Sequence, residues 1–146
     1  MFQVLESPRG LVSPKLCKGR RFFGTISIEM RRNRKDFLEN KERALALAKE
    51  HLHYFNQTYQ FDLAGIRIKI KNQKTRWGSC SKKGTINFNY RIVRLPQHLL
   101  YCVIVHELCH LGEFNHSKNF WNLVAKTLPN YAEMRRELRK NRISFY

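Results

Sequence analysis

The chain has 146 residues, of which 42% are hydrophobic and 27% are charged. These values are typical of a globular protein with a single core, so we expect one domain over residues 1–146. No apolar run approaches the ~20 residues that span a membrane, and the N-terminus lacks the basic start and apolar block of a signal peptide. The four cysteines have no framework spacing, which predicts reduced thiols and a cytoplasmic protein with no membrane partner.

The net charge is strongly positive, at +17. Such a surface attracts polyanions through counterion release, so nucleic acid is one candidate partner. The basic residues are spread along the whole chain, and no nucleic-acid reading motif accompanies them. A charge that serves only solubility is an equally good interpretation at this point.

The first part of the chain contains a predicted arm, a strand and a helix. Residues 1–20 are rich in Pro and Gly, which predicts a loop or arm. Residues 22–30 alternate between apolar and polar types, as in a half-buried strand. After a basic connector at 31–35, Asp36 fits the N-cap of a helix over about 37–58. The residues expected on the inward face of that helix are Leu38, Leu45, Ala48, Leu52 and Phe55.

Three more strands and three more helices are predicted after this helix. Residues 65–71 alternate isoleucine with basic residues, while 75–80 and 85–90 read as two strands of a hairpin. Gly78 within the first of these indicates a bulge or a close approach of the backbone. The later helices are expected over 96–111, where Pro96 suits the first turn, over 117–128, where Ser117 fits the N-cap, and from Asn130 onward.

The run His106-Glu107-Leu108-Cys109-His110 falls in the predicted helix 96–111. Helical residues four apart lie on one face, so His106 and His110 can offer two imidazole nitrogens to one ion. Glu107 lies about 100° further round, where it can hold and deprotonate a metal-bound water. Because this motif occurs by chance only about 0.015 times in a chain of this composition, we interpret it as a metal site.

A third protein ligand is expected from His116. We predict that Gly112 ends the helix in the left-handed conformation that glycine adopts readily, which lets the chain double back toward the ion. Three protein ligands leave a fourth position for water, as catalytic zinc requires. A rival set, Cys102 with His106 and Cys109, would form a structural zinc site, although buried thiols are common core residues.

Four further residues are candidates for substrate or transition-state contacts. Arg76 can hold an anion or a substrate carbonyl. Arg76, Tyr90 or Tyr101 can also help a zinc ion to stabilise an oxyanion. Trp77 is a candidate substrate platform, although core packing alone is the simpler interpretation for a tryptophan.

Several motifs together resemble the YgjP-like metallopeptidase domain, a family related to the SprT-like and WLM zincins. The resemblance extends from about Lys74 to Leu138. The motifs that carry it are Thr75-Arg76-Trp77-Gly78-Ser79-Cys80, Ile86-Asn87-Phe88-Asn89, the histidine motif, Asn115-His116-Ser117, Phe120-Trp121 and Leu128-Pro129-Asn130-Tyr131. The resemblance implies an α+β fold, namely a gluzincin-like minimal zincin with a small antiparallel sheet packed on an active-site helix and flanking helices.

The resemblance also implies functional roles. By position, His106, His110 and His116 would bind one Zn²⁺ per chain, and Glu107 would be the catalytic residue. The expected function is a zinc-dependent metallopeptidase that acts on a peptide or protein. Two alternatives stay open, namely a zinc-dependent hydrolase of nucleotide phosphoanhydrides and a nucleic-acid-associated basic module with a zinc site.

Overall fold

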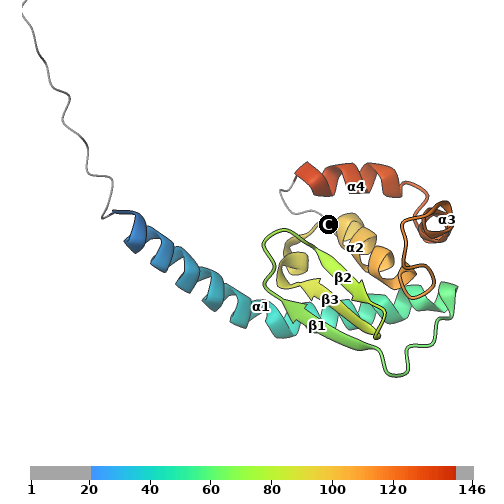
Figure 1. The fold of residues 1–146 in the computed structure, drawn as a ribbon, viewed down its shortest axis with the longest axis horizontal. Coiled ribbons are helices and arrows are strands. Elements are labelled where there is room, and N and C mark those ends of the chain that lie inside the picture. The colour runs from blue at the N-terminus through green and yellow to red at the C-terminus, as the bar shows by residue number, and fades with distance from the viewer. Residues whose placement is uncertain (1–20, 141–146) are drawn as a thin grey trace, which may run out of the picture. The chain divides into compact units, whose positions relative to one another are not determined.

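The computed structural model describes residues 21–140, and the chain divides into two compact units, residues 1–33 and 34–146. The second unit contains the sheet and every helix that follows it, and the prediction of one domain over the whole chain stays a prediction. The predicted arm at residues 1–20 lies outside the described residues. In chain order (Figure 1) the elements are α1 (Arg21–Tyr59), β1 (Arg67–Lys71), β2 (Gly78–Ser81), β3 (Thr85–Asn89), the 3-10 helix η1 (Tyr90–Arg94), α2 (Gln97–Cys109), α3 (Lys118–Thr127) and α4 (Tyr131–Lys140).

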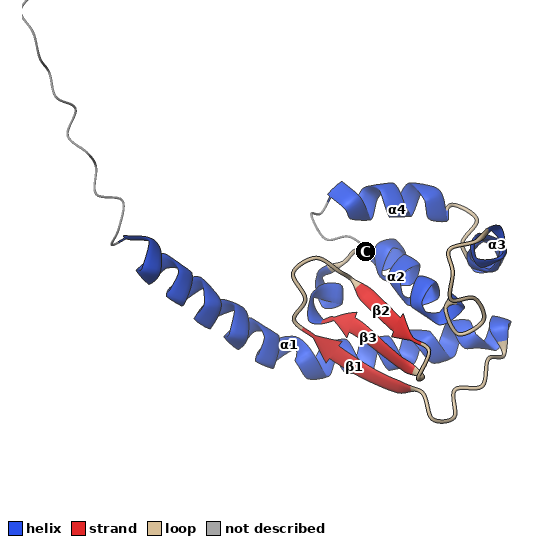
Figure 2. Cartoon of the chain, viewed as in Figure 1, coloured by secondary structure: helices blue, strands red, loops and turns tan. Residues whose placement is uncertain are grey.

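The three strands form one mixed sheet in the order β1-β3-β2 (Figure 2). β2 and β3 form the predicted antiparallel hairpin, in which Ser79 lies opposite Asn87. β1 instead joins β3 in parallel, with Ile68 opposite Ile86. The predicted α+β architecture with a small sheet beside flanking helices is therefore confirmed, but the sheet is mixed and not purely antiparallel. β2 follows β1 in sequence but does not pair with it. The two strands lie on opposite sides of β3 and form the two edges of the sheet.

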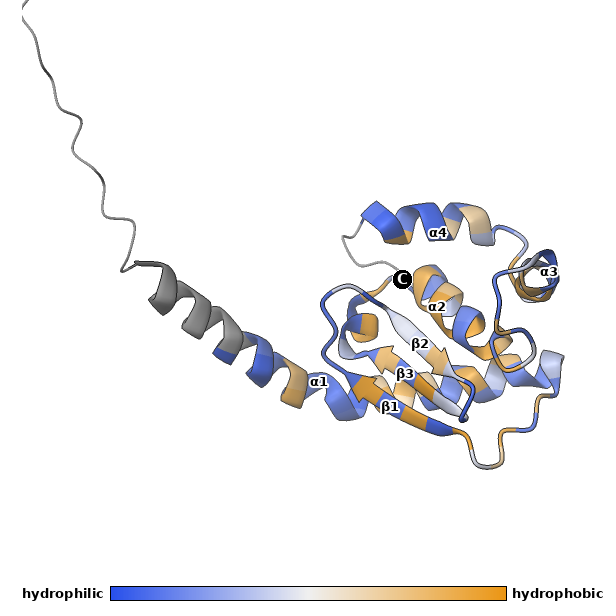
Figure 3. Cartoon of the chain, viewed as in Figure 1, coloured by the Kyte–Doolittle hydropathy of each residue, from blue (hydrophilic) through white to orange (hydrophobic). Residues whose placement is uncertain are grey.

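The core joins α1, the sheet and α2. Buried residues of α1, among them Ala44, Ala48 and Leu52, belong to the same cluster as Ile86 and Phe88 of β3. Helix α2 is apolar on almost every side, as expected of a helix enclosed by its neighbours, and it is largely orange in Figure 3. The histidine motif therefore lies at the end of a helix in which nearly every residue is buried.

Several predictions for the first part of the chain are wrong. Residues 22–30 belong to helix α1, and the sheet described over residues 21–140 takes no strand from them. The basic run 31–35 also continues α1, because Arg and Lys are good helix formers. Leu38, expected to face inward, is 61% exposed, whereas Ala48, Leu52 and Phe55 are buried as predicted.

Asp36 is not an N-cap, because it lies inside α1. Its carboxylate instead anchors α1 to η1. One oxygen accepts a hydrogen bond from the hydroxyl of Tyr90 at 2.7 Å, and the other accepts from Arg94 and from the side chain of Asn40. The carboxylate that the local sequence placed at an N-cap is thus bound by residues of η1.

Gly112 does not adopt the left-handed conformation that was predicted for it. Helix α2 ends at Cys109 with His110 as a right-handed C-cap, and the glycines with positive φ in the described residues are Gly65 and Gly84. A side chain at Gly112 would instead place its Cβ 2.9 Å from a ring carbon of Phe61. The glycine therefore permits a close approach of the chain that follows α2.

The described residues bear on two predictions, namely that the cysteines are reduced and that no segment spans a membrane. Cys80, Cys102 and Cys109 are free thiols, while Cys17 lies outside the described residues. Over residues 21–140, no helix is both long enough and apolar enough to cross a membrane.

Candidate metal centre

Helix α2 places the predicted metal-site residues where the spacing of the motif requires. His106 and His110 are both buried, at 3% and 8% exposure, and their ring centroids lie 4.9 Å apart. Glu107 is 2% exposed. The last turns of α2 therefore present two imidazoles and a carboxyl group that are almost completely buried.

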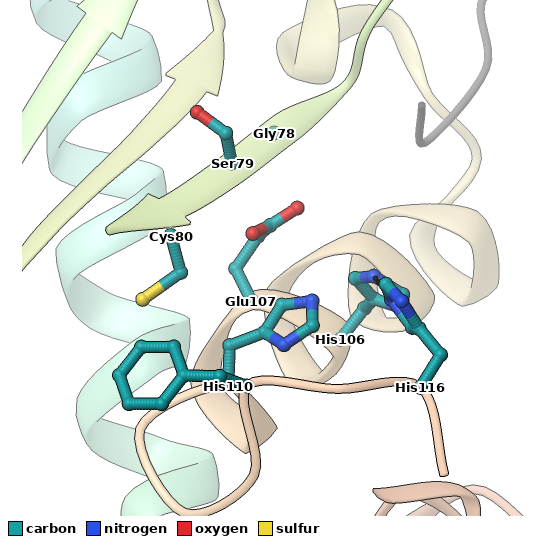
Figure 4. Close-up of a pocket in the computed structure, with 8 residues that line it drawn as sticks. Gly78, Ser79, Cys80, His106, Glu107, His110 and His116 are labelled. Atoms are coloured by element: carbon teal, nitrogen blue, oxygen red, sulfur yellow. Dashed lines mark hydrogen bonds between the residues drawn. The ribbon is translucent and has the colours of Figure 1, made fainter. Parts of the chain in front are cut away.

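The loop between α2 and α3 brings His116 to the same place (Figure 4). Its Nε2 lies 3.1 Å from Nε2 of His106, and one nitrogen from each of the three histidines lies within 4.8 Å of the others. We searched the described residues for groups of His, Cys, Asp and Glu side chains that could hold an ion, and these three histidines form such a group. Cys102 and Cys109 form no such group with His106 there.

The geometry of the three histidines fits a bound metal. Two nitrogens held at about 2.0–2.1 Å by one tetrahedral zinc lie about 3.3 Å apart, close to the separation seen for His106 and His116. Nδ1 of His110 lies 3.0 Å from the backbone carbonyl oxygen of Glu113. Because a carbonyl only accepts, Nδ1 carries the proton and Nε2 keeps a free lone pair for an ion.

All three imidazoles are held in the neutral form that binds metal. Burial lowers the pKa of His106 to about 2, and the neighbouring His110 and His116 act in the same direction. Burial also lowers the pKa of His116 to about 4 and lowers that of His110. At neutral pH no proton has to leave these rings before an ion binds.

Aromatic side chains from α3 fix the three rings. Phe120 is fully buried, and its ring centroid lies 5.0 Å from His106, 4.5 Å from His110 and 4.7 Å from His116. The ring centroid of Trp121 lies 5.6 Å from that of His116 and 5.9 Å from that of His106. This support predicts that little reorganisation is needed when an ion binds.

Glu107 is enclosed by the backbone of β2. A Cβ added to Gly78 would lie only 2.4 Å from Oε1 of Glu107, so the glycine provides the room that the carboxyl group needs. The predicted close approach of the backbone at Gly78 is thus observed. Burial raises the pKa of Glu107 to about 8, and the positive charge of Arg76 opposes this shift.

The carboxyl group faces a small pocket of about 200 Å³. Its Oε2 atom is buried and makes no hydrogen bond within the described residues. The residues that line the pocket come from β2, from α2 and from the loop after α2, and they are Gly78, Ser79, Cys80, His106, Glu107, His110, Phe114 and His116. A substrate in this pocket would therefore meet the three histidines, the glutamate and the edge strand together.

The other four predicted contact residues lie outside the pocket lining. Trp77 is 4% exposed and belongs to the core, and Tyr90 is fully buried with its hydroxyl donated to Asp36. Tyr101 packs on Phe55 and accepts a hydrogen bond from the side chain of Gln97. Arg76 is exposed and is the one of the four whose charge reaches Glu107.

Three residues that do line the pocket were not singled out from the sequence. Ser79 and Cys80 follow Gly78 on β2, and Figure 4 shows the Cys80 side chain on the same side of the strand as Glu107. Phe114 lies in the loop between the second and third histidines. Ser79 and Cys80 could have been identified from their positions in the sequence, because a strand that approaches Glu107 at Gly78 must also bring its next residues to the site.

Comparison with known proteins places these features in context. A scan against protein families matches the YgjP-like metallopeptidase domain over residues 28–141. A search of curated proteins finds no match. Among solved structures, the metallopeptidase zymogen of Pyrococcus abyssi abylysin has a TM-score of 0.59 and 22% identity, and the alignment covers 68% of this chain and 99% of that chain.

A second structure, the metallopeptidase zymogen of Methanocaldococcus jannaschii jannalysin, has a TM-score of 0.57 and 24% identity, covering 66% of this chain and 97% of that chain. At this identity the two structures establish a similar fold. The family match covers most of the chain, including every pocket residue, and it agrees with the motifs on which the resemblance was based. The chain belongs to the YgjP-like metallopeptidase domain family.

Proposed function

We propose that the chain is a zinc-dependent metallopeptidase in which His106, His110 and His116 bind the ion and Glu107 is the catalytic base. The observation that carries this proposal is the arrangement at the pocket. Three neutral imidazoles, with nitrogens within 4.8 Å of one another, share it with a buried carboxyl oxygen that has no hydrogen-bond partner there. Three nitrogen ligands with space beside them are typical of catalytic zinc sites.

Each protein group has a separate task in the proposed reaction. When bound, a zinc ion would supply Lewis acidity to the scissile carbonyl and to the attacking water. Glu107 accepts a proton from that water at a carboxylate oxygen and then delivers it to the leaving amine nitrogen. Its pKa of about 8 in the metal-free protein would fall beside a dication, toward the range of a general base at neutral pH.

The position of β2 supports a peptide as the substrate. β2 is an edge strand, and three of its residues line the pocket beside Glu107. An edge strand can pair with an extended peptide through its backbone, which holds a scissile bond in register with the site.

The composition of the pocket supports a peptide over a nucleotide. Among the residues that the structure describes, no Lys or Arg lines it, whereas phosphoryl transfer needs cations around the transferred group. Phosphoanhydride hydrolysis is therefore less well supported than peptide hydrolysis. A basic module with a merely structural zinc site would give the buried Glu107 no role.

The test combines metal content with hydrolysis. Purified protein should contain about one zinc per chain and should digest casein, and a chelator should abolish the digestion. Glu107→Gln should retain the zinc and lose about 10²- to 10⁴-fold in rate. Glu42→Gln, which changes an exposed glutamate of α1, is the matched control and should keep the wild-type rate.

A Glu107→Gln variant with full activity would refute the role of this residue. Phosphate release from nucleoside triphosphates, measured under the same conditions, should be undetectable. If it were rapid and casein stayed intact, the peptidase assignment would be wrong.

A further inference from the structure

The pocket has one aromatic wall that is open to solvent. Phe114 lines it from the loop between His110 and His116, and 41% of the Phe114 residue is exposed. The other large exposed hydrophobics among the described residues, Leu38 and Tyr54, lie on α1 and do not line this pocket. An aromatic ring kept partly in water beside a reactive site is a natural surface for an apolar group of a ligand.

A cation lies over this ring. Nζ of Lys82 is 5.9 Å from the ring centroid of Phe114, within the range of a cation–π contact. Lys82 occupies the turn directly after β2, the strand that also lines the pocket. The ring and the ammonium group therefore stand together beside the end of β2.

The turn that carries Lys82 is well defined. The backbone N–H of Gly84 donates to the carbonyl oxygen of Ser81 at 3.0 Å, and the N–H of Thr85 donates to the Ser81 hydroxyl at 3.2 Å. Gly84 has a φ of +71°, as the last residue of a three-residue hairpin loop often does. The start of the Lys82 side chain is consequently fixed relative to β2.

We propose that Phe114 and Lys82 form a specificity subsite, which takes a large apolar side chain on the aromatic ring and a carboxylate beside the ammonium group. This inference rests on the proposed peptidase function, and it assigns the substrate class as peptides with a large apolar residue next to an acidic one. The net charge of +17 acts in the same direction, since it attracts acidic chains and repels basic ones.

The experiment uses the zinc-loaded full chain and quenched fluorescent peptides of one length. The residues beside the central bond are varied between Phe and Ala and between Asp and Lys, and a neutral peptide is compared with free and amidated C-termini to separate a side-chain carboxylate from a terminal one. For the wild-type protein, we expect kcat/KM to favour Asp over Lys by about fivefold and Phe over Ala by about tenfold.

Two variants and one control assign these preferences to residues. Lys82→Glu should reverse the preference for Asp, and Phe114→Ala should remove most of the preference for Phe. Lys83→Glu makes the same charge change one residue away, and no contact of Lys83 with an aromatic ring is found in the described residues, so this control should keep both preferences. Because all three residues are exposed or partly exposed, zinc content and melting temperature should stay near the wild-type values.

The outcomes separate the two proposals. If the wild-type protein cleaves the peptides but Lys82→Glu and Lys83→Glu share its preferences, the subsite is refuted and the peptidase stands. A free C-terminus preferred over Asp at every position would likewise overturn the assignment of an acidic side chain. If zinc-loaded protein cleaves no peptide at all, both proposals fail.

Discussion

The carboxyl group of Glu107 lies buried beneath β2, where the backbone of Gly78 closes over it. Burial raises its pKa, while Oε2 still makes no hydrogen bond in the described residues. Such an arrangement is costly for a merely structural residue, because an unpaired buried polar group destabilises a fold. It is expected of a group that awaits a ligand or a reacting proton.

The contact between Gly78 and Glu107 leads to a prediction about packing. Gly78→Ala should lower the free energy of unfolding by about 1–3 kcal/mol, because its Cβ would overlap Oε1 of Glu107. In a Glu107→Ala background the same change should cost less than about 1 kcal/mol, since the overlapping atoms are gone. Chemical denaturation of the four proteins measures the coupling, and equal costs in both backgrounds would show that another contact is responsible.

The raised pKa of Glu107 predicts how the stability of the metal-free protein depends on pH. In the unfolded chain this carboxyl releases its proton near 4.5, whereas in the folded chain it holds the proton up to about 8. Between these values the folded state binds more protons, so raising the pH destabilises it by up to about 1.4 kcal/mol per unit. In chelator, the wild type should therefore lose stability relative to Glu107→Gln as the pH rises from 5 to 8.

The site histidines have the opposite effect, because their lowered pKa values stabilise the fold as the pH rises through their unfolded value of 6.5. The wild type and Glu107→Gln both carry these histidines. The difference between their curves of stability against pH therefore removes most of the histidine contribution. Parallel curves across this range would contradict the buried, raised carboxyl group.

At the scale of elements, the short helix α3 packs against the three histidines of the proposed metal site. Ser117 is its N-cap, as predicted, and the Ser117 hydroxyl accepts a hydrogen bond from the backbone N–H of Phe120 at 3.4 Å. That N-cap directly follows His116, and Phe120 touches all three imidazoles. The start of α3 thus fixes both the third histidine and the ring beneath the site.

We predict that Ser117→Ala lowers the stability of the metal-free protein by about 1 kcal/mol and also weakens zinc binding. Ser117→Thr, which can still cap the helix, should restore most of both properties. Asn122→Ala changes an exposed position of the same helix and is the control. Thermal melts in chelator and a competitive zinc titration measure the two effects, and a Ser117→Ala variant that matched Asn122→Ala in both would rule out this role for the cap.

At the scale of the whole unit from residue 34 onward, the two edges of the sheet differ. On β1 the residues Arg67, Lys69 and Lys71 are exposed, and charged side chains of this kind discourage an edge from pairing with another strand. β2 carries Gly78, Ser79 and Cys80 beside the pocket instead. The sheet therefore keeps one edge protected by charge and one edge suited to an extended peptide.

The sequence by itself determined the features that depend on local spacing. The spacing of His106 and His110 and the alternation of β1 follow from the periodicities of helix and strand. The hairpin of β2 and β3 and the cap at Ser117 follow from local turn and capping residues. The family followed from motifs as well, since their order and spacing are visible without coordinates.

Only the tertiary structure decided the features that depend on contacts between distant parts of the chain. Local alternation could not distinguish a strand from a helix at residues 22–30, and the local cap signal at Asp36 was overridden by its bonds to Tyr90 and Arg94. Gly78 was recognisable as a close approach, but the carboxyl group that it approaches lies 29 positions away. The pocket walls at Cys80 and Phe114 come from β2 and from the loop after α2, and no local pattern specifies how two such segments meet.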